Sequence, residues 1–184
     1  EAEVESVREQ IDAARAVGFG GTLHIAHVSV PDTVRIIEDA RPEVGFHISC
    51  EVSPHHALFS DRALDGMEGA EGLLFKTNPP LRPEKMRAEL MRQLLEGRID
   101  FVASDHAPHT LEDKRSRYAS GMPGLGFMHR FRERLEADGV GARLLDRLFH
   151  GGAEEIYGVE ISQNATVSRP RAQLDYETNP YTMD

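Results

Sequence analysis

The sequence of 184 residues has no tryptophan, one cysteine and no run of about 18 apolar residues. The single cysteine, Cys50, excludes an internal disulfide and is typical of a reducing compartment, so we expect a cytoplasmic protein. The lack of a long apolar run predicts no transmembrane helix, and no charged-then-apolar leader opens the chain. We therefore expect no membrane partner.

Basic residues are also scarce. The chain has 31 acidic residues against 21 Lys and Arg, which gives a net charge of −10 with neutral His. Because Lys and Arg drive binding to phosphate backbones, this balance argues against a nucleic-acid partner. The length sets a further limit, since a complete (β/α)8 barrel typically needs about 250 residues and at least about 200.

Apolar residues recur in two patterns along the chain. Spacings of three and four predict helices, and short runs rich in β-branched residues predict buried strands. We predict helices at residues 2–17, 32–40, 84–96, 127–137 and 142–149, and strands at 23–30, 45–53 and 99–105. A loop with a short helix is expected over 54–72, and a polar, glycine-rich loop over 106–126. Strands that alternate with helices predict an α/β fold with a parallel sheet.

Polar side chains gather at or near the carboxyl ends of all three predicted strands. They are His24 and His27, then Glu51, His55 and His56, then Asp105, His106 and His109. Ligands bind at this edge of parallel α/β sheets, and imidazole with carboxylate suits Zn²⁺. The alternative is a set of hydrogen-bonded structural histidines. Spacing alone leaves both interpretations open, because the sequence has no HxH or HExxH motif.

Four motifs carry a resemblance to a known family. LHIAHVS, EVSPHHALF, KTNPPLR and IDFVASDHAPH occur in this order. Together they resemble the second half of a dihydroorotase of the longer type, in the amidohydrolase superfamily, over about residues 3–126. Allantoinase and dihydropyrimidinase share the layout, but the pair His55–His56, together with Asn78 and His109, favours dihydroorotase.

The resemblance implies a fold and its boundaries. Residues 1–160 would form the C-terminal part of a (β/α)8 TIM-type metal-dependent hydrolase barrel, with about strands six to eight and their helices. The barrel would be incomplete in this chain. Residues 161–184 match the family poorly and are expected to form a C-terminal tail.

The resemblance also implies site residues. His27 and Asp105 would be zinc ligands, and Asp105 would also be the catalytic acid and base. Asn78 and His109 would bind the substrate, and Pro123 with Gly124, in GMPGLG, would contact the pyrimidine ring through the backbone. A complete site of the family would hold two Zn²⁺.

The implied reaction interconverts dihydroorotate and N-carbamoyl-L-aspartate in pyrimidine biosynthesis, with a zinc-activated hydroxide and Asp105 as proton carrier. The HxH pair and the carboxylated lysine or aspartate of the family have no counterpart here, so the chain alone is expected to be inactive. The alternatives are a non-catalytic, dihydroorotase-like structural partner of a transcarbamoylase and a related cyclic amidase. Self-association is also compatible with the family. His55, His56 and Glu51 are favoured as structural residues, with support of the site as the alternative.

Overall fold

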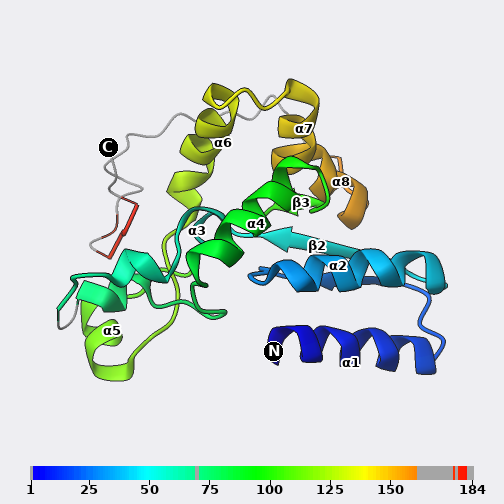
Figure 1. Ribbon diagram of the computed structural model, residues 1–184, viewed down its shortest axis with the longest axis horizontal. Helices are drawn as coiled ribbons and strands as arrows, with labels where there is room; N and C mark the ends of the chain where they lie inside the picture. Colours follow the sequence, from blue (N-terminus) through cyan, green and yellow to red (C-terminus); the bar gives the residue numbers. More distant parts are fainter. Residues whose placement is uncertain (1, 69–70, 161–175, 177, 182–184) are drawn as a thin grey trace.

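The computed structural model describes residues 2–68, 71–160, 176 and 178–181. It is a mixed α/β structure in which a small sheet lies among helices (Figure 1). Within the described residues, no helix is both long and apolar enough to cross a membrane.

The sheet has three parallel strands, β1 (Thr22–Ile25), β2 (His47–Val52) and β3 (Phe101–Val102), in the order β1-β2-β3. Thr22 pairs with His47, and Glu51 pairs with Phe101. The predicted parallel sheet is thereby confirmed. The strands are shorter than predicted because the backbone leaves the extended conformation soon after β1 and β3 end.

One face of the sheet packs against helices. The helices are α1 (Ala2–Ala16), α2 (Pro31–Ala40) and α4 (Glu84–Leu95). Apolar side chains of the strands and helices meet there in one core, which includes Val7, Ile11, Ile25, Val34, Ile37, Ile48, Cys50, Val52, Leu90 and Leu94. Strand alternation places His24, Ser49 and Glu51 on the opposite face, where His24 bonds to both of the others.

The remaining helices are short. They are α3 (Pro54–Leu58), α5 (Leu111–Arg117), α6 (Met128–Ala137), α7 (Ala142–Asp146), a π-helical turn (Arg147–Gly151) and α8 (Gly152–Tyr157). The prediction of a loop over 106–126 was wrong where α5 forms. The hydroxyl of Thr110 accepts a hydrogen bond from the backbone N–H of Asp113 at 3.1 Å and so caps this helix.

A single carboxylate joins the starts of α1 and α2. Glu3 accepts hydrogen bonds from the backbone N–H groups of Ser29 and Val30, at 3.1 and 3.0 Å, and from the Thr33 hydroxyl at 2.8 Å. Arg82 lies 3.3 Å from the same carboxylate. Since α2 has no side-chain cap of its own, Glu3 supplies the acceptor that its first turn needs.

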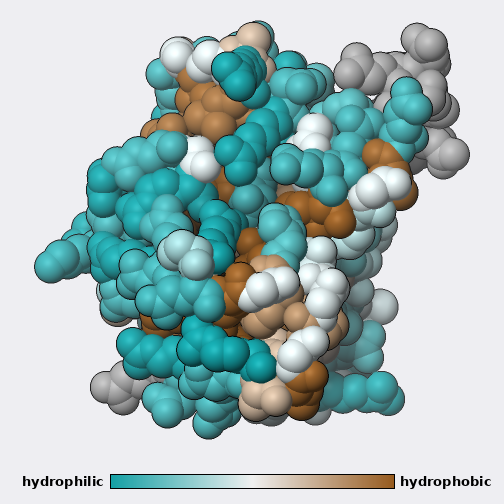
Figure 2. All heavy atoms as spheres, turned by 90° about the vertical axis from the view of Figure 1, so that its right-hand side faces the viewer, coloured by the Kyte–Doolittle hydropathy of each residue, from teal (hydrophilic) through white to brown (hydrophobic). Residues whose placement is uncertain are grey.

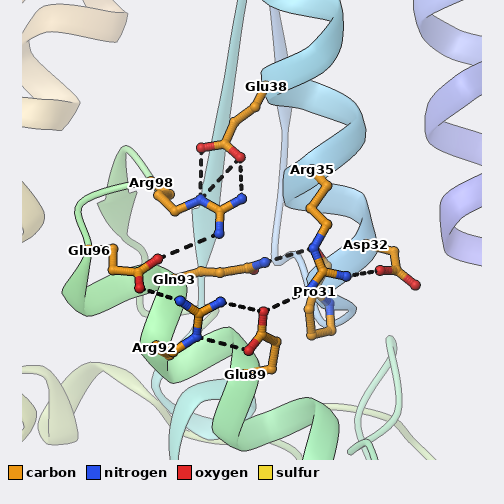
Figure 3. A network of polar contacts seen from close by, with 9 residues as sticks. All are labelled: Pro31, Asp32, Arg35, Glu38, Glu89, Arg92, Gln93, Glu96 and Arg98. Atoms are coloured by element: carbon orange, nitrogen blue, oxygen red, sulfur yellow. Dashed lines mark hydrogen bonds and ion pairs between the residues drawn. The ribbon is translucent and has the colours of Figure 1, made fainter.

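Ion pairs connect the outer surfaces of α2 and α4 (Figure 3). The network contains Asp32, Arg35, Glu38, Glu89, Arg92, Glu96 and Arg98. Arg35 crosses from α2 to Glu89 on α4 at 2.7 Å. Solvent-exposed pairs of this kind each stabilise a fold only slightly, so the apolar core contributes more than this network to the packing of the two helices.

The molecular surface is not uniformly polar. The side of the molecule at the right of Figure 1 is mainly hydrophilic, but apolar patches interrupt it (Figure 2). Large apolar side chains that are exposed at the ends of α1 and α8 include Val17, Phe19, Tyr157 and Val159. Part of the apolar surface of the described residues is therefore left uncovered.

The carboxylate of Asp100 anchors β3 to the rest of the fold. It accepts hydrogen bonds from the backbone N–H of Cys50 at 2.8 Å, from Arg41 at 2.5 Å and from Arg147 at 3.1 Å. The side chain is only 10% exposed. It therefore ties the start of β3 to β2 and to the π-helical turn at the same time.

Replacing Asp100 by Asn should destabilise the fold by about 2 kcal/mol, because it weakens the charge-assisted hydrogen bonds that the buried carboxylate accepts from Cys50, Arg41 and Arg147. Urea unfolding followed by circular dichroism measures this change. Asp138→Asn is the matched control, since Asp138 pairs with Arg134 on the surface and is 53% exposed. Equal effects of the two substitutions would contradict the anchoring role of Asp100.

Candidate active site

The parallel strands bring polar residues from distant parts of the sequence to one edge of the sheet. Asp105 follows β3, and His55 follows β2 at the start of α3. The His55 Nε2 atom lies 3.3 Å from the Asp105 Oδ2 atom. His55 is fully buried, whereas the side chain of Asp105 is 25% exposed. The Asp105 carboxylate therefore contacts a buried imidazole on one side and is accessible to solvent on the other.

Backbone strain marks two of the predicted site residues. Among the described residues, the non-glycine residues with positive φ are His27 (40°), Asp105 (43°) and Tyr118 (53°). Tyr118 ends α5, where such a conformation is common. His27 and Asp105 instead follow strands, and the conformation costs about 1–2 kcal/mol each. Strain of this kind clusters at functional sites, so its occurrence at both predicted zinc ligands is evidence for a site.

The imidazole of His27 has a nitrogen without a protein partner. Its Nδ1 atom is buried and has no hydrogen-bond partner within the described part of the chain. His27 lines a cavity of about 580 Å³ together with His24, Asn78 and Arg82. A buried imidazole nitrogen needs a partner, so this arrangement suits a ligand in the cavity. The structure thus brings two predicted residues, His27 and Asn78, to the same cavity.

Neighbouring imidazoles control the charge of Asp105. The hydrogen bond from His55 is the largest cause that lowers the pKa of the Asp105 carboxyl, and His27 and His56 add smaller favourable interactions. Burial opposes this shift but does not reverse it. Asp105 is therefore a carboxylate at neutral pH, as a metal ligand or a general base must be.

A second buried histidine, His56, lies next to His55. The His56 ring centre is 4.4 Å from that of His55, and burial together with the proximity of His55 lowers the pKa of His56 to about 3. The Ser53 hydroxyl lies between the two rings, 2.9 Å from His55 and 2.7 Å from His56. His56 is therefore neutral at physiological pH and belongs to the hydrogen-bonded interior of the site.

The other three predicted substrate-binding residues lie in and beside the loop before α6. His109 Nε2 donates to the carbonyl of Ser120 at 3.0 Å, and the N–H of Gly124 donates to the carbonyl of Met122 at 3.0 Å. Pro123, which directly precedes Gly124, is buried. These residues do not line the cavity of His27 and Asn78, and the N–H of Gly124 is occupied within the loop.

This loop packs directly against the end of β3. A methyl group at Gly124 would lie 2.0 Å from the carbonyl oxygen of Ser104, the residue before Asp105. Lys114, which is fully buried, donates to the carbonyls of Leu73 at 3.0 Å and Gly121 at 2.8 Å. The loop is therefore fixed on the backbone that carries Asp105, and Gly124 allows the close approach.

The described residues do not contain a complete metal site. No group of three or more His, Cys, Asp or Glu side chains in ranges 2–68, 71–160, 176 and 178–181 is arranged to hold a metal ion. His27 and Asp105 fit the role of ligands by residue type, by the unpartnered His27 nitrogen and by the ionised Asp105 carboxylate.

The sequence did not predict two contacts at this site, that of His55 with Asp105 and that of Tyr181 with His55. His55 was favoured as a structural residue, yet it makes the direct contact with Asp105. Tyr181, in the tail, lies with its hydroxyl 3.2 Å from His55 Nδ1. The signal for His55 was its place after a strand within a motif, whereas no motif includes Tyr181.

Comparison with known proteins supports the motifs. No family model matches the chain. It is 40% identical over 124 residues to the dihydroorotase of Listeria monocytogenes, which covers 66% of this chain and 28% of that protein. The resemblance to dihydroorotases is confirmed. The dihydroorotase of Bacillus subtilis is 41% identical over 112 residues, 61% of this chain and 25% of that protein. The chain thus spans less than a third of the length of these relatives.

Solved structures show the same relationship at the level of the fold. L-hydantoinase (dihydropyrimidinase) from Arthrobacter aurescens aligns with a TM-score of 0.71 at 25% identity, over 84% of this chain and 34% of that one. Dihydroorotase from Campylobacter jejuni aligns with a TM-score of 0.67 at 12% identity, over 85% and 43% of the two chains. These neighbours are TIM-barrel amidohydrolases.

Gly124→Ala should destabilise the fold by roughly 1–3 kcal/mol, because the added methyl group must displace the backbone beside Asp105. Thermal unfolding checks this expectation. Gly20→Ala is the matched control, since a methyl group at Gly20 meets no atom within 4 Å. An unchanged melting temperature for Gly124→Ala would show that the loop does not pack on β3 in this way.

Proposed function

We propose that this chain is part of a dihydroorotase-like hydrolase that acts on a cyclic amide and interconverts dihydroorotate and N-carbamoyl-L-aspartate in pyrimidine biosynthesis. The observation that carries the proposal is the pair His27 and Asp105. Both follow strands of one parallel sheet, both have a left-handed backbone, and both lie in motifs that resemble dihydroorotase. A small-molecule substrate and a cytoplasmic location belong to the proposal.

Zinc is the proposed metal, with two ions in the complete site. His27 and Asp105 would be ligands, and bound Zn²⁺ would supply a water of lowered pKa and polarise the substrate carbonyl. Two protein ligands are fewer than a catalytic zinc site needs. The proposal therefore includes further ligands from outside these 184 residues, and it expects the chain alone to be inactive.

The side chains of this chain have separate roles in the proposed reaction. Asp105, ionised at neutral pH, takes a proton from the attacking water and passes it to the ring nitrogen as the amide bond breaks. Asn78 faces the cavity and binds the ring amide. His109 is proposed to bind the substrate carboxylate, and the backbone of Pro123 and Gly124, in the loop before α6, is proposed to contact the pyrimidine ring.

The proposed architecture is an incomplete barrel over residues 1–160. Its support is the three-stranded parallel sheet, the likeness to TIM-barrel amidohydrolases and the apolar surface left exposed near α1 and α8. The tail, 161–184, is a separate segment in this proposal. Most of it lies outside the described residues.

A related cyclic amidase is the second candidate. It is favoured by the structural likeness to a hydantoinase (dihydropyrimidinase), whose TM-score of 0.71 exceeds the value of 0.67 for the Campylobacter dihydroorotase. The identity of 40% to dihydroorotases over 124 residues favours the first candidate. The third candidate, a non-catalytic partner of a transcarbamoylase, is favoured by the lack of a three-ligand cluster in the described residues.

Hydrolysis of dihydroorotate and zinc content distinguish enzyme from non-catalytic partner. Both should be measured on this chain and on a version extended at its N-terminal side. The extended protein should bind zinc and turn over dihydroorotate, and Asp105→Asn should abolish turnover because it removes the proton carrier. An extended protein without metal and without turnover would contradict the enzyme proposal, and activity that survives Asp105→Asn would contradict the role of Asp105.

Substrate preference separates the two enzyme candidates. The active form should hydrolyse dihydroorotate far faster than dihydrouracil or allantoin, because His109 is proposed to bind the carboxylate that only dihydroorotate carries on its ring. Steady-state kcat/KM values for the three compounds measure this preference. His109→Ala should lower kcat/KM for dihydroorotate alone, and a preference for dihydrouracil would favour the dihydropyrimidinase alternative.

A further inference from the structure

The side chain of Tyr181 is buried at the edge of the candidate active site. It is 2% exposed, and its ring stacks on that of Phe127 with ring centres 4.2 Å apart. The centre of the Phe59 ring lies 5.3 Å from the centre of the Tyr181 ring. Its hydroxyl lies 3.2 Å from His55 Nδ1. Tyr181 comes from the 161–184 segment, which matches no dihydroorotase motif.

The direction of the hydrogen bonds around His55 can be derived from the far end of the network. His56 Nε2 lies 2.9 Å from the carbonyl oxygen of Pro79. A carbonyl only accepts, so His56 carries its proton on Nε2. His56 is neutral, so its Nδ1 is an acceptor, and the Ser53 hydroxyl donates to it at 2.7 Å.

The Ser53 hydroxyl also fixes which nitrogen of His55 carries the proton. Because the Ser53 proton points to His56, the Ser53 oxygen accepts from His55 Nε2 at 2.9 Å. The same Nε2–H faces the Asp105 carboxylate at 3.3 Å. In the neutral imidazole with its proton on Nε2, His55 Nδ1 is an acceptor, and the Tyr181 hydroxyl at 3.2 Å is its donor. Burial raises the pKa of Tyr181, so its hydroxyl keeps the proton that it donates.

We propose that Tyr181 is a positioning residue for Asp105 and acts through His55. The hydroxyl satisfies the buried Nδ1 atom and so holds the imidazole with its Nε2–H toward the carboxylate. Without it, His55 would have a buried acceptor with no partner, which is a costly arrangement. A role of Tyr181 in catalysis rests on the proposed function. The hydrogen bond between Tyr181 and His55 does not depend on it.

Other contacts hold this part of the tail at the same edge. The Thr178 hydroxyl donates to the carbonyl of His109 at 2.8 Å, and the Tyr176 hydroxyl lies 3.2 Å from His106 Nε2. Tyr176 therefore offers a matched control. It makes the same kind of contact as Tyr181 with a different histidine, and it is 39% exposed instead of buried.

Nuclear magnetic resonance of the full chain, labelled with ¹⁵N in histidine and ¹³C in aspartate, tests the proposal without metal or substrate. Tyr181→Phe keeps the ring stack and removes the hydroxyl. The ¹⁵N resonance of His55 Nδ1 should move toward that of a nitrogen without a hydrogen bond, and the ¹³Cγ resonance of Asp105 should shift with it. Tyr176→Phe should change neither resonance. An unchanged His55 signal in Tyr181→Phe, or equal changes in both variants, would overturn the proposal.

A double-mutant cycle shows whether the effect on Asp105 passes through His55. His55→Leu removes both ring nitrogens and therefore the link between the Tyr181 hydroxyl and the Asp105 carboxylate. In this background, Tyr181→Phe should leave the Asp105 ¹³Cγ resonance where it is. A shift as large as in the wild-type background would mean that Tyr181 acts by another route.

The wild-type chain alone provides a second measurement if Tyr181→Phe does not fold. Its spectrum should show the His55 proton on Nε2, with a slowly exchanging Tyr181 hydroxyl proton correlated to Nδ1. A proton on Nδ1 would overturn the proposal. In a form that hydrolyses dihydroorotate, Tyr181→Phe should lower kcat by up to about tenfold and leave KM unchanged. If no form binds zinc, the proposed function fails, and the spectra still decide the role of Tyr181.

Discussion

The site depends on how β3 is held against β2. Two residues of β3 pair with β2, and the backbone N–H groups of Asp100 and Ala103 extend this contact with hydrogen bonds to the carbonyls of Cys50 at 3.1 Å and Val52 at 3.0 Å. The Asp100 carboxylate adds a further constraint, because it accepts a hydrogen bond from the backbone of β2 and binds two arginines from other elements. Asp105 follows five residues later, so its place beside His55 is set by this anchor as much as by the strand pairing.

Much of the fold could be predicted from the sequence, because it follows from apolar periodicity. Helices α1, α2 and α4 and the parallel order of three strands follow from this pattern. The strand ends did not follow from it, because the left-handed backbone at His27 and Asp105 leaves no trace in hydropathy. Helix α5 was missed since its polar sequence lacks an apolar stripe, although Thr110 and Asp113 form a capping pattern that identifies its start.

The sequence predicted only those site residues that lie within recognisable motifs. His27 and Asp105 were identified from motifs, and their strained backbones are independent evidence for a site. The contact of His55 with Asp105 depends on the turn that Pro54 begins and on the orientation of one ring, which strand spacing does not specify. Tyr181 lies 126 residues from His55 in the sequence, and only the folded chain shows that they meet.

The left-handed backbone at His27 and Asp105 has a consequence for how such a chain can change. Glycine or asparagine adopts this conformation at lower cost, so the most stable sequence for this backbone is not the one that carries the reactive side chains. Replacement by glycine would remove the backbone strain at both positions and, with it, both proposed ligands. A homologue with glycine at these two positions would therefore retain the backbone of the fold but lack both proposed metal ligands.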